Sequence, residues 1–276
     1  MTDRLLRAIT SDGSYRVVAA RTTDLVALNR EQHEPGPAAA LALARALTCA
    51  ALISTFEKDF YRISLQWNGR GPLGLIHADV RPTGALRAYV TDPTSTLPLA
   101  QAVGPGVFGV VEQDDAGRVT RGTLPLDTHE IDTDVEAFLR RSEQVPSVIR
   151  VFVGEGDRPE VAGLLIQRLG DVEEDGDPVA PEARSRSLDA GSELDHLMVA
   201  ALPGHMIKLL AEQPLSLGCE CSLDRIERGV CLLGPAELTE MADGDEEARV
   251  RCEFCSRDFV VDPPRLRELA TILSQA

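Results

Sequence analysis

Cys219-Glu-Cys221 and Cys252-Glu-Phe-Cys255 decide how the C-terminal part of this 276-residue chain folds. They form a C-x-C pair and a C-x-x-C pair, and the segment between them (222–251) is long enough to fold back and bring four sulfurs together. Four cysteine ligands suit Zn2+, which binds thiolates tetrahedrally at about 2.3 Å and has no redox chemistry of its own. The sequence therefore predicts one zinc ion on these four cysteines, with any electron chemistry on the sulfurs.

Two interpretations of this site stay open from the spacing alone. In the first, zinc is purely structural and contributes roughly 10–16 kcal/mol of apparent folding free energy to a small module. In the second, an oxidant converts the thiolates to disulfides that cannot hold the metal, so oxidation removes the free energy that folds the module. The close partners are Cys219 with Cys221 and Cys252 with Cys255, and we expect the C-x-C bridge to be strained and readily reduced.

The other candidates for chemistry have simpler explanations. Cys49 and Cys231 have apolar neighbours, which predicts buried and unreactive side chains. The histidines show no spacing typical of a metal site; they are His33, His77, His129, His196 and His205. The chain lacks G-x-S-x-G and Walker A motifs. The G-x-G-x-x-G pattern occurs at 69–74 and 104–109, but each stretch contains Pro and neither opens a predicted helix, so a hydrolase, NTPase or dinucleotide enzyme has no support. We therefore predict that the protein is not an enzyme.

Charge and hydropathy limit the partners and the location. The net charge is −16, from 44 acidic and 28 basic residues, so we expect no nucleic-acid partner. The first residues show no signal sequence, which predicts a cytoplasmic protein with reduced thiols. The apolar stretch 37–56 is rich in Ala and contains Arg45, so we predict a buried helix of a globular core and not a membrane span.

The predicted fold class is α+β, and it begins with a core domain over residues 1–170. Strand and helix patterns alternate there, with strong turn signals between neighbouring strands, which indicates an antiparallel sheet with helices. Its predicted helices cover 37–56 and 132–142, and its predicted strands cover 15–20, 61–67, 73–80, 85–90, 119–124, 148–153 and 161–169.

A linker and a small domain are expected after this core. From Asp171 to Asp195 the chain is strongly acidic and has few large apolar side chains, so it buries too little to offset its ordering entropy. We predict a marginally stable linker over 171–213, with helices at 193–202 and 204–212. The zinc-binding domain is predicted to cover 214–276 and to end in a helix after Pro263-Pro264.

These motifs together resemble the redox-regulated holdase chaperones known as the heat shock protein 33 family. The resemblance covers nearly the whole chain, and its pieces occur in the family's order. The pieces that carry it are Gly71-Pro-Leu-Gly74, Ser142-Glu-Gln144-Val-Pro146-Ser, Cys219-Glu-Cys221-Ser-Leu-Asp-Arg225, Gly234-Pro-Ala-Glu-Leu238 and Val250-Arg-Cys252-Glu-Phe-Cys255.

The resemblance implies a chaperone that is inactive while it is reduced and zinc-bound. Oxidation of the four cysteines would release zinc and unfold both the zinc domain and the linker. The exposed surface would then bind unfolding client proteins without ATP, and the active form would be a homodimer. Two departures from the family are the strongly acidic linker, which would weaken the switch if it were already disordered, and Ala162 in place of the usual Gly, where we expect only a packing change.

Two functions from other classes stay open. A constitutive zinc-ribbon interaction module would bind zinc in the same way but would gain no client binding after oxidation. A thiol-disulfide oxidoreductase would use Cys252-Glu-Phe-Cys255. Such enzymes place C-x-x-C at a helix start in a thioredoxin-like fold and need no second cysteine pair.

Overall fold

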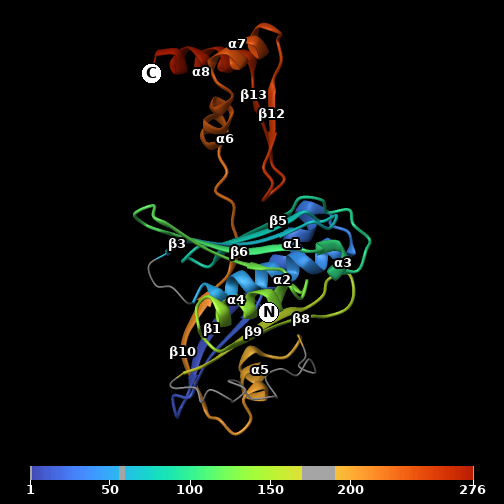
Figure 1. Ribbon diagram of the computed structural model, residues 1–276, viewed down its shortest axis with the longest axis vertical. Coiled ribbons are helices and arrows are strands. Elements are labelled where there is room, and N and C mark those ends of the chain that lie inside the picture. Colours follow the sequence, from blue (N-terminus) through green and yellow to red (C-terminus); the bar gives the residue numbers. More distant parts are fainter. Residues whose placement is uncertain (1, 56–59, 170–189, 276) are drawn as a thin grey trace. The chain divides into compact units, whose positions relative to one another are not determined.

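The computed structural model describes residues 2–55, 60–169 and 190–275. The chain forms two compact units, unit 1 (Met1–Gly218) and unit 2 (Cys219–Ala276) (Figure 1). Helices and mainly antiparallel strands confirm the predicted α+β class. The functional division into core, linker and zinc domain stays a prediction, and most of the acidic linker segment, residues 170–189, lies outside the described residues.

Unit 1 contains a five-stranded antiparallel sheet, sheet A, with the strand order β10-β1-β2-β9-β8. Its strands are β1 (Arg4–Thr10), β2 (Tyr15–Arg21), β8 (Ser147–Val153), β9 (Val161–Arg168) and β10 (Ile207–Pro214). The strands predicted from apolar patterns are confirmed at β2, β8 and β9, whereas β1 was not predicted.

The helix predicted over 204–212 is wrong. Residues Ile207–Pro214 form strand β10, which pairs with β1 so that Ile207 lies opposite Thr10. The stretch is rich in Leu, Ala, Lys, Glu and Gln, which favour a helix in isolation. Pairing with β1 satisfies the same backbone groups, and tertiary context outweighs the weak local preference.

A second sheet of unit 1, sheet B, has the strand order β11-β5-β4-β3-β6-β7. Its strands are β3 (Phe60–Gly69), β4 (Leu75–Val80), β5 (Ala85–Val90), β6 (Gly106–Asp114), β7 (Val119–Pro125) and the short β11 (Ser216–Leu217). All neighbours pair antiparallel except β11 with β5. Alternate side chains of β3, such as Leu65 and Trp67, are buried in the core, as its period-2 pattern predicts.

Helix α2 (Pro37–Ile53) lies between the two sheets (Figure 1) and contacts strands of both. Its small Ala side chains allow this close approach. At the contact with β9, a Cβ on Gly163 would lie 2.4 Å from Cγ2 of Thr48, so a larger residue here would force the Thr48 side chain or α2 to shift. The predicted buried helix is confirmed, and Arg45 is held by the carboxylates of Glu130 and Asp132. Among the described residues, no helix is both long and apolar enough to span a membrane.

The other helices of unit 1 complete its layers. They are α1 (Thr23–His33), α3 (Leu99–Val103), α4 (Ile131–Arg141) and α5 (Leu194–Ala201). Helix α4 packs against the edge strand β8 and α5 against the face of sheet A opposite α2 (Figure 1). The predicted helices over 132–142 and 193–202 are therefore confirmed.

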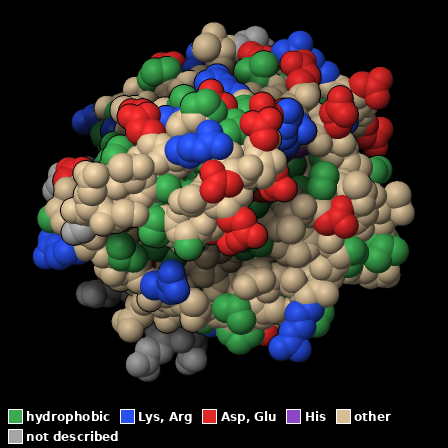
Figure 2. All heavy atoms as spheres, turned by 90° about the horizontal axis from the view of Figure 1, so that it is seen from above, with side chains coloured by type: hydrophobic (Ala, Val, Ile, Leu, Met, Phe, Trp, Pro, Cys, Tyr) green, Lys and Arg blue, Asp and Glu red, His purple; other side chains and the backbone are tan. Residues whose placement is uncertain are grey.

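On the face drawn in Figure 2, acidic side chains are scattered among Lys and Arg, as the composition predicts.

Unit 2 is a small helical unit with one hairpin. Its elements are α6 (Leu223–Val230), a 3-10 turn (Cys231–Leu233), α7 (Pro235–Asp243), β12 (Ala248–Arg251), β13 (Asp258–Val261) and α8 (Pro263–Gln275). The predicted C-terminal helix is confirmed at α8. The buried apolar residues are few and aliphatic: Val230, Leu238, Ala242, Ala248, Val261, Leu266, Leu269 and Ala270.

Candidate metal centre

The first cysteine pair immediately precedes α6. Ser222 caps this helix, because its Oγ accepts a hydrogen bond from the N–H of Arg225 at 3.3 Å. Ser222 itself has extended backbone angles, as is usual for a residue that caps a helix in this way. The cap therefore fixes where the extended segment that carries Cys219 and Cys221 turns into a helix.

The second cysteine pair lies in the turn between β12 and β13. The N–H of Cys252 donates to the carbonyl of Arg257 at 2.9 Å, and the N–H of Ser256 donates to the carbonyl of Cys252 at 2.8 Å. Ser256 has a φ of +56°, which lets the chain reverse directly after Cys255. These backbone bonds place both sulfurs at the tip of the hairpin.

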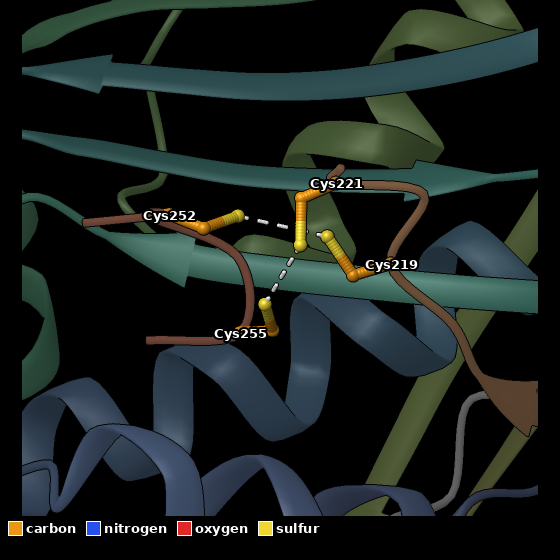
Figure 3. A group of neighbouring side chains, drawn as sticks. All are labelled: Cys219, Cys221, Cys252 and Cys255. Carbon is orange, nitrogen blue, oxygen red and sulfur yellow. Dashed lines mark hydrogen bonds between the residues drawn. The ribbon is translucent and has the colours of Figure 1, made fainter. Parts of the chain in front are cut away.

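All four sulfurs of the predicted set converge on one point (Figure 3). The Sγ atoms of Cys219 and Cys252 are 3.6 Å apart, and those of Cys221 and Cys255 are 3.4 Å apart. All four ligand atoms lie within 4.8 Å of one another. A tetrahedral zinc site with bonds of about 2.3 Å has sulfur–sulfur edges of about 3.8 Å, so the cluster has the size that such a site needs. The four cysteines could hold a metal ion, and their chemistry fits zinc.

The electrostatic environment differs among the cysteine thiols of the cluster. Burial raises the pKa of the Cys219 thiol, and burial with the thiols of Cys255 and Cys219 raises that of Cys221 to about 12. Burial also acts to raise the pKa of Cys252, but backbone N–H groups of Cys255 and Phe254 stabilise its thiolate, and the net pKa is lowered. One sulfur is thus set to ionise first while others resist. A divalent ion would hold all four as thiolates.

The two remaining cysteines lie outside the cluster. Cys49 is fully buried in α2, and burial raises the pKa of its thiol well above the ordinary value, so it has the inert environment that was predicted. Cys231 is half-buried rather than buried, and it packs against the apolar core of unit 2. It starts the 3-10 turn after α6 and is not among the grouped sulfurs.

Sequence reasoning found the four candidate ligands but missed the contacts that join their two chain segments. Glu227 of α6 accepts two hydrogen bonds from the guanidinium of Arg265 in α8. The two residues are 38 positions apart, so neither helical spacing nor a local motif links them in the sequence.

A second non-local contact, in unit 1, was also missed. Arg21 of β2 holds the segment before α5, because its guanidinium donates to the carbonyls of Ala190 and Ser192.

Comparison with known proteins gives a consistent family. The family model described as Hsp33 protein matches residues 3–262. The 33 kDa chaperonin of Geobacter sp. (strain M21) is 33% identical over 100% of this chain and 99% of its own length. The 33 kDa chaperonin of Nostoc punctiforme is also 33% identical, over 98% of this chain and 96% of its own length.

A solved structure has the same fold. The crystal structure of the 33 kDa chaperonin (heat shock protein 33 homolog) of Thermotoga maritima matches with a TM-score of 0.89 over 100% of both chains. Its sequence identity is 21%, so it bears on the fold alone. The range matched by the family model contains both cysteine pairs of this chain, and the curated relatives match nearly its whole length. These matches show that this protein belongs to the Hsp33 family.

Proposed function

We propose that this protein is a redox-regulated, ATP-independent holdase that binds unfolding proteins under oxidative stress. The observation that carries the proposal is the cluster of four cysteine sulfurs within 4.8 Å, in a unit whose own apolar core is small. Bound zinc would supply much of the free energy that keeps unit 2 folded while the protein is reduced. The protein would act in the cytoplasm, where thiols are kept reduced, and it would bind clients without catalysing a reaction on them.

Oxidation would remove the ligands in balanced steps. Two thiolates give two electrons to one hydrogen peroxide, which takes up two protons from the solvent and becomes two waters, while one S–S bond forms. A disulfide carries no thiolate charge, so each oxidised pair can no longer hold the metal. Four cysteines thus require two peroxides for complete release.

The proposed disulfides join Cys219 with Cys221 and Cys252 with Cys255. The shortest sulfur contacts instead run across the two pairs, 219 with 252 and 221 with 255. A cross-pair bridge would keep the two chain segments joined and would oppose unfolding of unit 2, whereas bridges within the pairs leave the segments free to separate. Peptide mapping of the oxidised, non-reduced protein distinguishes these pairings, and cross-pair peptides would contradict the proposed mechanism.

The face of sheet A beneath α5 is the proposed client surface. Side chains of α5 and of this face form one buried apolar cluster: Leu6, Ala8, Val17, Ala19, Val148, Phe152, Ala162, Leu164, Ile166, Ala190, Leu194, Leu197, Met198, Ala201 and Leu202. Helix α5 has eight residues and no side-chain N-cap bond, so it is too short to be stable alone and depends on this packing. Release of α5 would expose a large apolar surface, which fits unfolded chains and a second copy of the activated protein.

Hydrogen exchange tests whether unfolding reaches this surface. In the sequence β10 and β11 lie between α5 and Cys219. We therefore expect peroxide to remove amide protection from unit 2, β10 and α5, and to leave α2 protected. Loss of protection confined to unit 2 would contradict the proposed route to the client surface.

The decisive experiment follows zinc release and aggregation together. Reduced, zinc-loaded protein should not suppress aggregation of a denatured client, and peroxide should release one zinc per chain and create suppression. The Cys231→Ser variant should behave like the wild type, since this cysteine lies in the same unit but outside the cluster. Zinc release without suppression would favour the constitutive zinc-ribbon module and end the holdase proposal.

A further inference from the structure

A second link, made without sulfur, joins the two halves of unit 2. The Nε of Arg265 donates to Oε1 of Glu227 at 2.9 Å, and its Nη2 donates to Oε2 at 2.8 Å. This is the paired, planar geometry in which a guanidinium binds a carboxylate most strongly. The hydrogen bonds from Arg265 lower the pKa of Glu227, which therefore stays charged. The backbone N–H of Arg265 donates to Asp262, so the arginine is itself fixed at the start of α8.

The positions of the two helices make this contact relevant to the metal site. Helix α6 starts two residues after Cys221, and its Ser222 cap fixes that junction. Helix α8 follows β13 directly, and the β12–β13 turn carries the other cysteine pair. The ion pair therefore ties the segment of the first cysteine pair to the segment of the second.

Few other side chains could replace this tie. On α6 only Glu227 and Val230 are buried, and Ile226 is partly buried against the apolar core. A charged side chain thus lies where an amphipathic helix usually presents an apolar one. Because Glu227 is only 7% exposed, loss of Arg265 would leave a largely buried carboxylate without its charged partner.

We propose that the Glu227–Arg265 pair is a metal-independent latch that positions the first cysteine pair against the second and slows the loss of zinc. Glu227 and Arg265 are positioning residues, since neither reaches the metal. This inference rests on the proposed zinc site and deepens its regulation, because the latch determines how readily chelation or oxidation opens unit 2. Breaking the latch should weaken zinc binding although all four ligands remain.

A matched pair of variants in the full-length protein tests the latch. Glu227→Gln keeps the shape but removes the charge, and we expect it to transfer zinc to a chromophoric chelator with roughly tenfold weaker apparent affinity, as for partners that support metal ligands. Glu268→Gln removes the other carboxylate bound to Arg265, through Nη1 at 2.6 Å. Glu268 is exposed and lies on α8 itself, so its contact with Arg265 does not join two chain segments. Its loss should therefore change zinc affinity by less than twofold.

A double-mutant cycle separates a latch from general destabilisation. If the two residues act as one unit, Glu227→Gln combined with Arg265→Gln should weaken zinc binding no more than the stronger single variant. Arg265→Lys keeps the charge but loses the paired geometry, and it should lie between the wild type and Arg265→Gln. It also provides a milder test if Glu227→Gln does not fold.

The outcomes distinguish the latch from the proposed function on which it rests. If the wild type binds no zinc, the zinc site and the latch both fail. If the wild type binds one zinc while Glu227→Gln, Arg265→Lys and Glu268→Gln all release it as the wild type does, the latch is overturned and the zinc site stands. Additive losses in the cycle would also overturn the latch.

Discussion

Unit 1 and unit 2 are stabilised by different means, although they belong to one chain. Unit 1 places α2 between two sheets and fully buries large side chains such as Trp67 and Phe108. Unit 2 spans 58 residues (219–276), and among its described residues the buried apolar cluster has eight members, none of them aromatic. A unit below roughly 70–80 residues rarely gains enough from a core alone and usually needs a metal or disulfides. We therefore expect the metal site to matter directly for unit 2, and within unit 1 only for β10 and α5.

Removal of zinc should have the largest effect among the tests of this difference. A strong chelator should unfold unit 2, because roughly 10–16 kcal/mol of apparent folding free energy is lost with a four-thiolate site. Circular dichroism should show the loss of α6, α7 and α8. Trp67 is the only tryptophan and lies in β3 of unit 1, so its fluorescence should not change. A change in Trp67 emission upon chelation would show that the core of unit 1 also depends on the metal, and it would contradict this difference between the units.

Leucine truncation in each unit gives the next largest effect. Leu47→Ala in α2 should lower the free energy of unfolding of unit 1 by about 2–5 kcal/mol, because Leu47 is fully buried and the change leaves a cavity. Chemical denaturation followed by Trp67 fluorescence measures this loss. Zinc transfer to a chelator should be unchanged.

Leu266→Ala is the counterpart in unit 2. Leu266 is also fully buried. If folding of this unit is coupled to metal binding as proposed, the variant should release zinc more readily and leave the Trp67 transition in place. Leu209→Ala is the control on β10, since its side chain is exposed and the change should stay within about 0.5 kcal/mol. If Leu47→Ala weakens zinc binding as much as Leu266→Ala does, the two units are not stabilised by different means.

Local patterns were sufficient wherever a segment's partners are near in sequence or its composition is extreme. The Ala-rich stretch after Pro37 predicted α2, and period-2 alternation predicted β3. The four cysteines were found from spacing, because a metal site imposes residue type and separation together. These features need no knowledge of the rest of the chain.

Non-local contacts account for what the sequence did not reveal. Strand β10 contains helix-favouring residues and becomes a strand only because β1, some 200 residues earlier, offers an edge. Glu227 looks like one more acid on a solvated helix face, and its partner Arg265 follows 38 residues later. The face of sheet A beneath α5 likewise has no local signature, since its residues come from β1, β2, β8 and β9.

Ionisation of a buried acid in unit 1 should have the smallest effect on stability, and zinc should not influence this effect. Asp134 of α4 is only 4% exposed; its Oδ1 accepts a hydrogen bond from Oγ1 of Thr128 at 2.8 Å, and its Oδ2 has no partner among the described residues. Burial raises the pKa of Asp134 to about 6, above its ordinary 3.8. The folded state therefore binds this proton more tightly than the unfolded state between these two values. Stability of unit 1 falls as pH rises through this window, and the full cost is present above about pH 6.

Asp134→Asn keeps an acceptor for Thr128 and abolishes the ionisation. We expect it to stabilise unit 1 at pH 7.5 by at most about 3 kcal/mol, the equivalent of a shift of about two pKa units, and the gain should shrink as pH falls below about 6. Asp132→Asn, two residues earlier in α4, is the matched control, because Oδ2 of Asp132 accepts the N–H of Val151 and its Oδ1 pairs with Arg45. That variant should destabilise unit 1. Denaturation followed by Trp67 fluorescence from pH 4.5 to 7.5 measures both variants, and a gain for Asp134→Asn that did not depend on pH would show that its ionisation is not the cause.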